Sequence, residues 1–356
     1  MKIADISINN KIVTQVNMYD SGTNFYKNIN NIINQYKSVF IITQENISDG
    51  ILTNISINNI SKVKTFLLDD SPKCKSENQL KEILKFLIIN KCNKNSLIIG
   101  IGGGSVSDIV GFSASIYMRG INHVIIPTTL LGMVDAAIGG KTAIDFNDIK
   151  NLIGTFKHPE KILIFPDFLL SLPKNEIING FAEIIKYALI MDKNLFNFID
   201  NNKDSIFFKT KFQDLNEIII KCIKHKISIV EKDELDKNYR QILNFGHTAG
   251  HAIESYFDFK ISHGVAVLYG IKVATKMSLE LNKINIDIYD RIINLINTLN
   301  IPKINEIKIN AIIDIMYFDK KSSNNQINFI ILNNIGEAAV KKNIDVELIK
   351  KGLSIL

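Results

Sequence analysis

Short apolar runs alternate with helical patterns through the first 165 residues of the chain. Four runs of five or six residues are typical of strands: VFIIT (39–43), KTFLL (64–68), SLIIGI (96–101) and HVIIP (123–127). A further apolar run, KILIF (161–165), ends this part of the chain. Between the second and third runs, segment 78–91 has apolar residues at helical spacing. Strands that alternate with helices predict a parallel sheet with helices on its faces.

The pattern changes after residue 165. Longer segments with helical periodicity follow, at 175–191, 213–231, 242–257, 264–282 and 287–299. We therefore predict an α/β Rossmann-like domain over residues 1–165 and a mainly α-helical domain over residues 166–356. No run of 18 uncharged apolar residues occurs, so we expect no membrane-spanning helix.

Composition excludes several classes of protein. Of the 356 residues, 46% are hydrophobic and 22% are charged, and the formal net charge is +6. The lysines are scattered rather than clustered with aromatic residues, which argues against a nucleic-acid groove. The N-terminus has no apolar signal segment, and the three cysteines show no paired spacing. We expect a cytoplasmic protein without disulfides and without a cysteine-based zinc site.

Arginine is rare in this chain. Of 42 basic residues, only Arg119, Arg240 and Arg291 are arginine. A guanidinium group grips a carboxylate or phosphate through two parallel hydrogen bonds, which an ammonium group cannot do. Where lysine is the usual cation, an arginine therefore points to a geometric requirement.

The glycine-rich segment GIGGGSVSD (100–108) follows a predicted strand and should begin a helix. Glycines allow a ligand to approach the backbone, and a helix N-terminus offers free N–H groups to a phosphate. The segment is not the G-x-G-x-x-G fingerprint, so a tight turn capped by Ser107 or Asp108 is the alternative. Polar and cationic groups expected at the same sheet edge are Arg119, Asp135, Lys141, Lys150 and Asn151.

A helical segment at 179–190 carries two opposite charges among apolar residues. Glu183 and Lys186 are three residues apart and therefore share one face of the helix. A carboxylate in apolar surroundings needs a cation or a metal as its partner. The alternative is an ordinary surface ion pair.

Three of the six histidines, His247, His251 and His263, fall within seventeen residues. The first two are four apart and lie on one helix face. Thr248 follows the first histidine, which excludes the H-E-x-x-H metalloprotease motif. A catalytic zinc commonly takes three protein ligands, which Glu183 and two of the histidines would supply. Buried, hydrogen-bonded histidines are the alternative.

Seven segments together resemble the 3-dehydroquinate synthases, a group of sugar-phosphate cyclases. In order and in spacing they are GGGSVSDIVGFSASIYMRG, IPTTLLGMVDAAIGGKTAID, KNLIGTF, NGFAEIIK, RQILNFGHTAGHAIE, HGVAVLYGI and DKKSSN. The resemblance runs from about residue 95 to residue 335. No single motif would suffice, but seven in register are highly specific.

The resemblance implies an enzyme that uses NAD and one divalent metal, zinc or cobalt. Its substrate would be a small sugar-acid phosphate, 3-deoxy-D-arabino-heptulosonate 7-phosphate, and its products 3-dehydroquinate and phosphate. Transient oxidation by NAD allows phosphate to leave, and reduction and an intramolecular aldol step then close the ring. The resemblance thus implies a carbon–oxygen lyase of the shikimate pathway and a homodimer, without nucleic-acid or membrane partners.

The resemblance also assigns roles to individual residues. The implied metal ligands are Glu183, His247 and His263. The implied catalytic residues are Lys141, Lys186, Asp236, Arg240 and His251. The implied substrate-binding residues are Arg119 (from the neighbouring subunit), Asp135, Lys141, Asn151, Lys186, Lys226, Arg240, Asn244 and the Lys320/Lys321 pair. The implied NAD-binding residues are Asn46, Lys75, Gly103, Gly104, Ser105, Asp108, Thr128, Thr129, Lys141, Lys150, Phe168, Ser171 and Asn179.

Three departures from the family pattern concern the same sites. Ser107 stands where the family often has glycine, and Asp236 stands where it has a glutamate thought to transfer a proton. Gln44 and Pro72 replace two acids that grip the adenosine ribose of NAD. We therefore expect this chain to retain NAD less tightly than a fully matching relative.

Other functions remain open at this level. A deoxy-scyllo-inosose or valiolone synthase acts on a substrate without a carboxylate and needs fewer cations, so Arg240 and Lys226 favour the dehydroquinate reaction. A polyol dehydrogenase of related fold, such as a glycerol-1-phosphate or iron-dependent alcohol dehydrogenase, is a second alternative. Such an enzyme would produce NADH, whereas a dehydroquinate synthase would not. An inactive NAD-binding protein would not need the full set of metal ligands and lysines.

Overall fold

The computed structural model describes residues 1–56, 61–70, 72–147, 149–208, 212–304, 307–319 and 327–356. The chain divides into two compact units. The first comprises Met1–Leu172 and Lys226–Leu235, and the second comprises Pro173–His225 and Asp236–Leu356. Segment Lys226–Leu235 thus belongs to the first unit, although the sequence pattern placed it with the second half of the chain. No helix among the described residues is long and apolar enough to cross a membrane.

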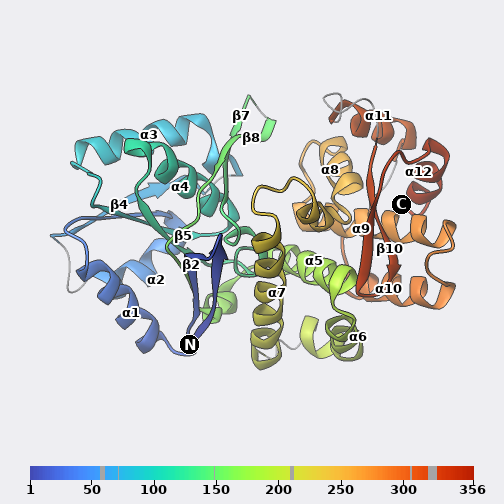
Figure 1. Cartoon of the computed structure of the whole chain (residues 1–356), viewed down its shortest axis with the longest axis horizontal. Helices are drawn as coiled ribbons and strands as arrows, with labels where there is room; N and C mark the ends of the chain where they lie inside the picture. The colour runs from blue at the N-terminus through green and yellow to red at the C-terminus, as the bar shows by residue number, and fades with distance from the viewer. Residues whose placement is uncertain (57–60, 71, 148, 209–211, 305–306, 320–326) are drawn as a thin grey trace. The chain divides into compact units, whose positions relative to one another are not determined.

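A seven-stranded sheet forms the centre of the first unit (Figure 1). Its strands are β1 (Lys2–Ile8), β2 (Lys11–Met18), β3 (Val39–Gln44), β4 (Val63–Leu68), β5 (Leu97–Gly102), β6 (Asn122–Pro127) and β9 (Lys161–Ile164). Their order across the sheet is β1-β2-β9-β6-β5-β3-β4, and all neighbours are parallel except the antiparallel pair β1–β2. The four strands predicted from the apolar runs are confirmed as β3, β4, β5 and β6, and β9 lies in the apolar run KILIF that ends the α/β pattern.

The edge hairpin β1–β2 was not predicted, although its turn carries a signal. Asn9 and Asn10 have φ angles of +50° and +62°. A two-residue hairpin turn needs two left-handed residues in succession, and asparagine tolerates this conformation. A pair of asparagines between two alternating segments is therefore a hairpin signal that the search for continuous apolar runs overlooks.

Helices cover both faces of this sheet (Figure 1). On one face, α1 (Gly22–Asn34) and α2 (Glu45–Ser56) bury aromatic and aliphatic side chains against β3, β5 and β6. On the other face lie α3 (Glu77–Ile89), which is the helix predicted at 78–91, and α4 (Gly104–Ile116). Gly100 of β5 allows α4 to approach closely, because a Cβ there would lie 3.0 Å from Val110.

The direction of strand addition reverses between β3 and β5. β4 lies on one side of β3, and β5, β6 and β9 follow in turn on the other side. In open α/β sheets, ligands bind beyond the carboxyl ends of the strands at such a reversal. Gln44 ends β3 and Gly102 ends β5, so both residues flank this position.

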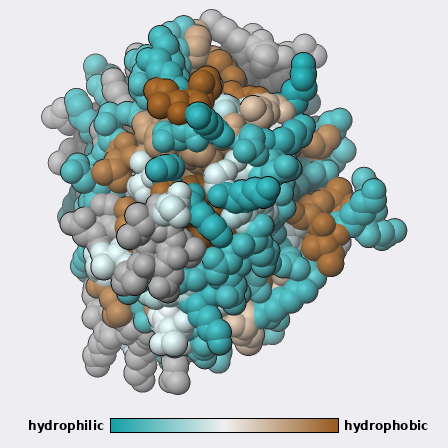
Figure 2. Space-filling view, turned by 90° about the vertical axis from the view of Figure 1, so that its left-hand side faces the viewer, coloured by the Kyte–Doolittle hydropathy of each residue, from teal (hydrophilic) through white to brown (hydrophobic). Residues whose placement is uncertain are grey.

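Shorter elements complete the first unit. They are the 3-10 turns η1 (Pro72–Lys75), η2 (Tyr117–Arg119) and η4 (Pro166–Ser171), the π-helical turn η3 (Gly132–Ala136), and a separate hairpin of β7 (Lys141–Phe146) and β8 (Ile149–Phe156). On the face in Figure 2, the described residues are mostly hydrophilic, with apolar side chains in small separate groups. This distribution is consistent with lysines that are scattered over the surface.

Helix α9 (His263–Glu280) is the centre of the second unit. Most of its side chains are buried, as in a helix surrounded by other elements. Its neighbours are α5 (Lys174–Met191), α8 (His247–Tyr256), α10 (Ile286–Thr298), α12 (Val346–Leu353) and β10 (Phe329–Asn334). The remaining elements are α6 (Lys193–Phe208), α7 (Phe212–Lys232), whose last residues belong to the first unit, η5 (Tyr239–Asn244), α11 (Ile309–Asp319) and β11 (Glu337–Lys341).

Four of the five helices predicted in the second half are confirmed as α5, α7, α9 and α10. The fifth, predicted at 242–257, is wrong at its start: η5 occupies 239–244, and α8 begins only at His247. Gly246 between them has a φ angle of +79°, and a Cβ there would lie 2.6 Å from a side-chain carbon of Ile271. The helix therefore starts late because the backbone must turn left-handed where it meets α9.

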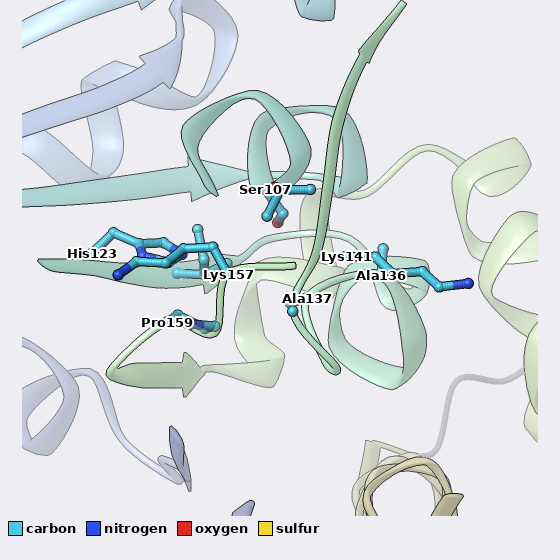
Figure 3. A pocket seen from close by; sticks show the side chains of 10 residues that line it. Ser107, His123, Ala136, Ala137, Lys141, Lys157 and Pro159 are labelled. Carbon is cyan, nitrogen blue, oxygen red and sulfur yellow. The ribbon is translucent and has the colours of Figure 1, made fainter. Parts of the chain in front are cut away.

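A buried histidine lies in β6. His123 is 1% exposed and lines a cavity of about 10 Å³, large enough for about one water, together with Ser107 and Lys157 (Figure 3). Its Nδ1 makes no hydrogen bond within the described part of the chain. Burial lowers the pKa of His123 from 6.5 to about 3, and the positive charges of Lys157 and His158 act in the same direction. The imidazole is therefore neutral near pH 7.

This histidine should make folding stability sensitive to mild acid. Below about pH 6.5, His123 of the unfolded chain binds a proton, whereas His123 of the folded chain stays neutral down to a pH of about 3. The unfolded state then binds more protons, so stability falls with falling pH, by about 2 kcal/mol from pH 6.5 to pH 5. We expect His123→Gln to remove this part of the pH dependence in urea unfolding at pH 7 and pH 5. Equal pH dependence in both proteins would contradict the assignment.

Candidate active site

The glycine-rich turn joins β5 to α4 in the first unit. Gly103 is the N-cap of α4 and provides no side-chain cap, so the predicted alternative of a cap by Ser107 or Asp108 is wrong. Gly102 must be glycine, because a Cβ would lie 2.5 Å from Val106. The backbone N–H groups of the first turn, which include Gly104 and Ser105, form the kind of end that binds a phosphate.

The Thr128–Thr129 pair lies beside this turn. The N–H of Thr128 donates to the carbonyl of Gly102 over 2.9 Å. A Cβ on Gly103 would lie 3.0 Å from the methyl group of Thr129. The structure thus brings the predicted NAD residues Gly103, Thr128 and Thr129 together at the carboxyl ends of neighbouring strands.

Lys75 connects three segments of the first unit. Its Nζ donates to Asp108 Oδ2 over 2.9 Å and to Asn151 Oδ1, and it lies 3.6 Å from Asp145 Oδ1. Burial alone would lower the pKa of the Lys75 ammonium, but Asp108 and Asp145 outweigh burial and raise it. Asp145 also accepts the backbone N–H of Asn151 over 2.9 Å. Sequence reasoning assigned no role to Asp145, although it ends the segment IPTTLLGMVDAAIGGKTAID.

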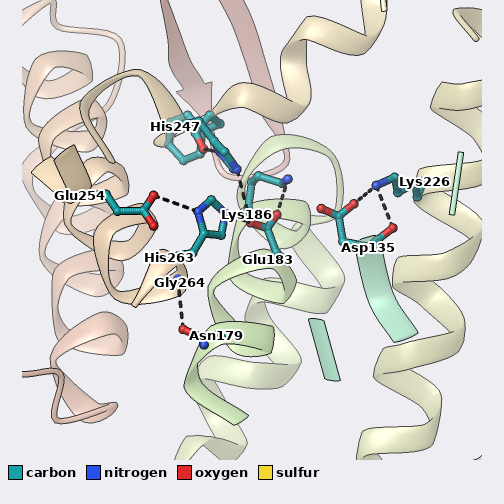
Figure 4. Close-up of polar contacts among 10 residues, drawn as sticks. Asp135, Asn179, Glu183, Lys186, Lys226, His247, Glu254, His263 and Gly264 are labelled. Atoms are coloured by element: carbon teal, nitrogen blue, oxygen red, sulfur yellow. Dashed lines mark hydrogen bonds and ion pairs between the residues drawn. The ribbon is translucent and has the colours of Figure 1, made fainter. Parts of the chain in front are cut away.

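A cavity of about 530 Å³ lies next to this ionic group. Its lining includes Asp108, Lys141, Asn151 and Lys226, all from the first unit. Lys226 donates to the backbone carbonyl of Asp135 over 2.9 Å and pairs with its carboxylate (Figure 4). Asp135 lies in the π-helical turn η3, a type of element frequent at functional sites. The volume suits a small-molecule ligand.

Arg119 lies in an exposed turn and does not line this cavity. Met118 and Arg119 have φ angles of +49° and +61°. Two consecutive non-glycine residues in the left-handed region are strained, and strain of this kind concentrates at functional sites. Asp258 and Phe259 share this conformation, so the backbone at Arg119 is unusual but is not unique to it.

Other predicted NAD residues are spread over the first unit. Gln44 Nε2 donates to the carbonyl of Asp69 over 3.4 Å, just after β4. Asn46 is exposed in the first turn of α2, and Lys150 is exposed on β8.

Phe168 and Ser171 both belong to η4. The Phe168 ring packs edge-on against Phe25 and Phe165, with centroids 5.5 and 5.2 Å apart. Its ring thus contributes to the core on the α1 side of the sheet.

Three helices of the second unit bring Glu183, His247 and His263 together (Figure 4). Glu183 lies in α5, while His247 and His263 are the first residues of α8 and α9. The Nε2 atoms of the two histidines lie 3.5 and 3.9 Å from Glu183 Oε1. The predicted metal ligands are therefore neighbours in space.

The far nitrogens of both rings face acceptors. His247 Nδ1 lies 3.2 Å from the carbonyl of Phe245, and His263 Nδ1 lies 3.5 Å from Glu254 Oε2. A proton held at Nδ1 would leave the Nε2 lone pair of each ring available to a metal. Histidines that bind a metal are commonly held in this way.

Glu183 is an ionised carboxylate that is only 1% exposed. Burial by itself raises its pKa, but Lys186 and the imidazoles of His247 and His263 outweigh burial and hold the pKa well below its usual value. Oε2 pairs with Lys186, and neither oxygen accepts a hydrogen bond within the described residues. A buried carboxylate with two imidazole nitrogens beside it is a donor set that suits a cation, so these residues fit a divalent metal.

His251 lies on the exposed side of the same group. Its ring centroid is 5.3 Å from that of His247 and 5.7 Å from that of His263. The three histidines can also present nitrogen atoms within 4.8 Å of one another. A solvent-accessible imidazole next to the ligand pair is suited to moving protons.

The remaining predicted residues of the second unit lie around η5 and α5. Arg240 in η5 is 2% exposed, Asn244 ends η5 and is exposed, and Asp236 has a φ angle of +55°. Asn179, predicted to bind NAD, uses its Oδ1 to accept the N–H of Gly264 over 3.1 Å. Lys320 and Lys321 lie outside the described residues.

Comparison with known proteins settles the family. Residues 65–179 match the family model described as 3-dehydroquinate synthase N-terminal, and residues 180–322 match the one described as 3-dehydroquinate synthase C-terminal. The 3-dehydroquinate synthase of Clostridium tetani (strain Massachusetts / E88) is 36% identical over 323 residues, which is 90% of this chain and 86% of the relative. The chain belongs to the 3-dehydroquinate synthase family. The resemblance inferred from seven motifs is confirmed.

Two solved structures of similar fold are sugar-phosphate cyclases. A 2-deoxy-scyllo-inosose synthase complexed with carbaglucose-6-phosphate, NAD+ and Co2+ is 20% identical, with a TM-score of 0.87 over 99% of both chains. A 2-epi-5-epi-valiolone synthase from Streptomyces hygroscopicus subsp. jinggangensis 5008, with NAD+ and Zn2+ bound, is 21% identical, with a TM-score of 0.87 over 98% of both chains. These likenesses confirm the predicted fold class of the 3-dehydroquinate synthase family.

The start of α9 should tolerate no side chain at Gly264. A Cβ there would lie 2.4 Å from the Cα of Asn179, a backbone atom of α5 that cannot give way cheaply. We expect Gly264→Ala to lower the free energy of unfolding by about 1–3 kcal/mol. Gly50→Ala in α2 is the matched control: nothing lies within 4 Å of its added Cβ, and alanine favours a helix. Urea unfolding measures both; an unchanged Gly264→Ala protein would refute the close contact.

Proposed function

We propose that this chain is a 3-dehydroquinate synthase, a carbon–oxygen lyase that converts 3-deoxy-D-arabino-heptulosonate 7-phosphate into 3-dehydroquinate and phosphate. The main support is the 36% identity to the Clostridium tetani enzyme across 90% of this chain. The cyclases with other products reach only 20 and 21% identity over a shared fold. The reaction is a step of the shikimate pathway, which we place in the cytoplasm; all three cysteines are free and buried.

NAD+ would bind to the first unit. Its pyrophosphate fits the N–H groups at the start of α4, next to the Thr128–Thr129 pair. Lys75 and Asp108 would hold the turn in place through their ion pair. When bound, NAD+ accepts a hydride from the substrate and later returns it, so the overall reaction has no net redox change.

The second unit would hold one divalent metal, zinc or cobalt, through Glu183, His247 and His263. Such a metal supplies a Lewis acid that lowers the pKa of a substrate hydroxyl. His251, exposed beside the ligand pair, would take up and return protons at its ring nitrogens. Asp236 is a second candidate for proton transfer, with a shorter arm than the glutamate of the family pattern.

Cationic and polar side chains would hold the two anionic groups of the substrate. Lys141, Asn151 and Lys226 line the cavity of the first unit, and Asp135 fixes Lys226. In the second unit we assign the same task to Lys186, Arg240, Asn244 and Lys320. The charge of the substrate, a carboxylate and a phosphate, accounts for this number of cations.

We also propose a homodimer in which Arg119 serves the site of the neighbouring subunit. Arg119 is exposed and is one of only three arginines in the chain, which supports a role in binding an anion. β8 exposes Ile149, Leu152 and Phe156 at 54%, 54% and 41%. Exposed apolar side chains on one short strand are suited to contact with a second copy.

The test of the proposed function is phosphate release from 3-deoxy-D-arabino-heptulosonate 7-phosphate with added NAD+ and Zn2+. We expect stoichiometric phosphate and no accumulation of NADH. NADH in proportion to product would favour a polyol dehydrogenase. Turnover of glucose 6-phosphate in place of the seven-carbon substrate would favour a deoxy-scyllo-inosose synthase. No turnover of either substrate would favour an inactive NAD-binding protein.

Arg240 offers a sharper prediction within this function. Arg240→Lys keeps the charge but loses the two parallel hydrogen bonds that a guanidinium group can donate to an anion. A hydrogen bond to a charged group contributes about 1.5–3 kcal/mol. We expect kcat/KM to fall roughly ten- to a hundred-fold. Arg291→Lys is the control: this arginine pairs with Asp200 and Asn197 over 2.9–3.1 Å and should leave kcat/KM unchanged. Equal effects of the two substitutions would argue against an anion contact at Arg240.

A further inference from the structure

The proposed reaction leaves one buried acid of the second unit without a role. Glu254, in α8, is 4% exposed. Its Oε2 lies 3.5 Å from Nδ1 of His263, on the side of the ring away from Glu183 (Figure 4). Burial of a carboxylate is costly, so a contact with one specific nitrogen points to a task at that nitrogen.

The contact follows from the register of α8 against α9. A Cβ on Gly270 would lie 1.8 Å from the carbonyl oxygen of Gly246, and a Cβ on Gly250 would lie 3.0 Å from that of Ala266. The two helices are thus antiparallel, and glycines allow their backbones to touch at two levels. One further turn along α8 from Gly250 is Glu254, and the residue it meets is His263, at the start of α9.

A carboxylate accepts hydrogen bonds and donates none. A hydrogen bond between His263 and Glu254 therefore requires a ring proton on Nδ1, and Glu254 is the nearer of the two carboxylates that face this ring. The lone pair of a neutral imidazole is then on Nε2, which lies 3.9 Å from Glu183 Oε1. For His247 the carbonyl of Phe245 has the corresponding position at Nδ1. One ligand is thus oriented by a neutral backbone group and the other by a charged side chain.

We propose that Glu254 is a positioning residue for the metal: it fixes His263 in the Nδ1–H tautomer and increases the basicity of Nε2. This inference rests on the metal site of the proposed function. Loss of such an acceptor typically lowers metal affinity ten- to a hundred-fold. Glu254 itself does not bind the metal, so its removal weakens the site without abolishing it.

The first experiment measures Zn2+ affinity of the metal-free full-length chain by competition with a chromogenic chelator. We expect Glu254→Gln to raise the dissociation constant ten- to a hundred-fold and His263→Ala to raise it further. Glu254→Asp keeps the charge but shortens the arm, so it should also bind more weakly. Glu347→Gln removes an acid of the same unit that is 71% exposed and should bind Zn2+ as the unchanged chain does.

The second experiment reads the tautomer directly, in metal-free protein labelled with 15N at its six histidines. The signals that disappear in His263→Ala identify the ring. We expect the Nδ1–H pattern in the unchanged chain and a shift towards Nε2–H in Glu254→Gln. A residue that only supported the fold would leave this pattern unchanged.

The outcomes separate this inference from the proposed function. Unchanged Zn2+ affinity in Glu254→Gln, with loss of affinity in His263→Ala, would overturn the role of Glu254 and leave the metal site standing. Unchanged affinity in His263→Ala would overturn the metal site itself. Should Glu254→Gln not fold, the unchanged chain still decides, because an Nε2–H tautomer at His263 overturns the proposal without any variant of Glu254.

Discussion

The arrangement of α5, α8 and α9 in the second unit centres on the ionised carboxylate of Glu183 and its contacts with Lys186, His247 and His263. This carboxylate lies almost fully buried on α5, next to Lys186 on the same helix face, and it faces the first residues of α8 and α9. A buried charge is tolerated only where other groups compensate it. The start of each of these two helices places an imidazole against the same oxygen. The charge thus explains why three helices converge at one point of an otherwise apolar core.

The first unit has a counterpart of opposite sign. There a partly buried ammonium, that of Lys75, lies between the carboxylates of Asp108 and Asp145. Asp108 belongs to the helix that follows the glycine turn, and Asp145 belongs to the hairpin that carries Lys141 and Asn151. One cation therefore holds together the two segments that would bind different ligands. In both units, the polar groups of the site also support the local fold.

The sequence predicts those parts of the fold that depend on local pattern. Apolar runs identify β3, β5 and β6, because a strand that is covered on both faces needs such a run. They also identify β4, although only the last residue of that strand is buried. The start of α8 could not be predicted from spacing, since the left-handed turn at Gly246 is imposed by Ile271 of another helix. The cluster of Glu183, His247 and His263 came from the resemblance to the family; spacing alone left buried histidines equally open. The roles of Asp145 and Glu254 could not be predicted from the sequence, because each acts through a contact with a residue from a separate segment, Lys75 and His263 respectively.

The glycines between α8 and α9 have a consequence for how this region can change in evolution. A side chain at Gly246, Gly250 or Gly270 would each force apart the same two backbones. Once one substitution has separated the helices, a second would meet less resistance, so their effects should be strongly non-additive. The first substitution then carries most of the cost, and this first step keeps the two helices at close range. His247 and His263 begin these two helices. The close contact of the helices therefore also fixes the distance between the two histidines.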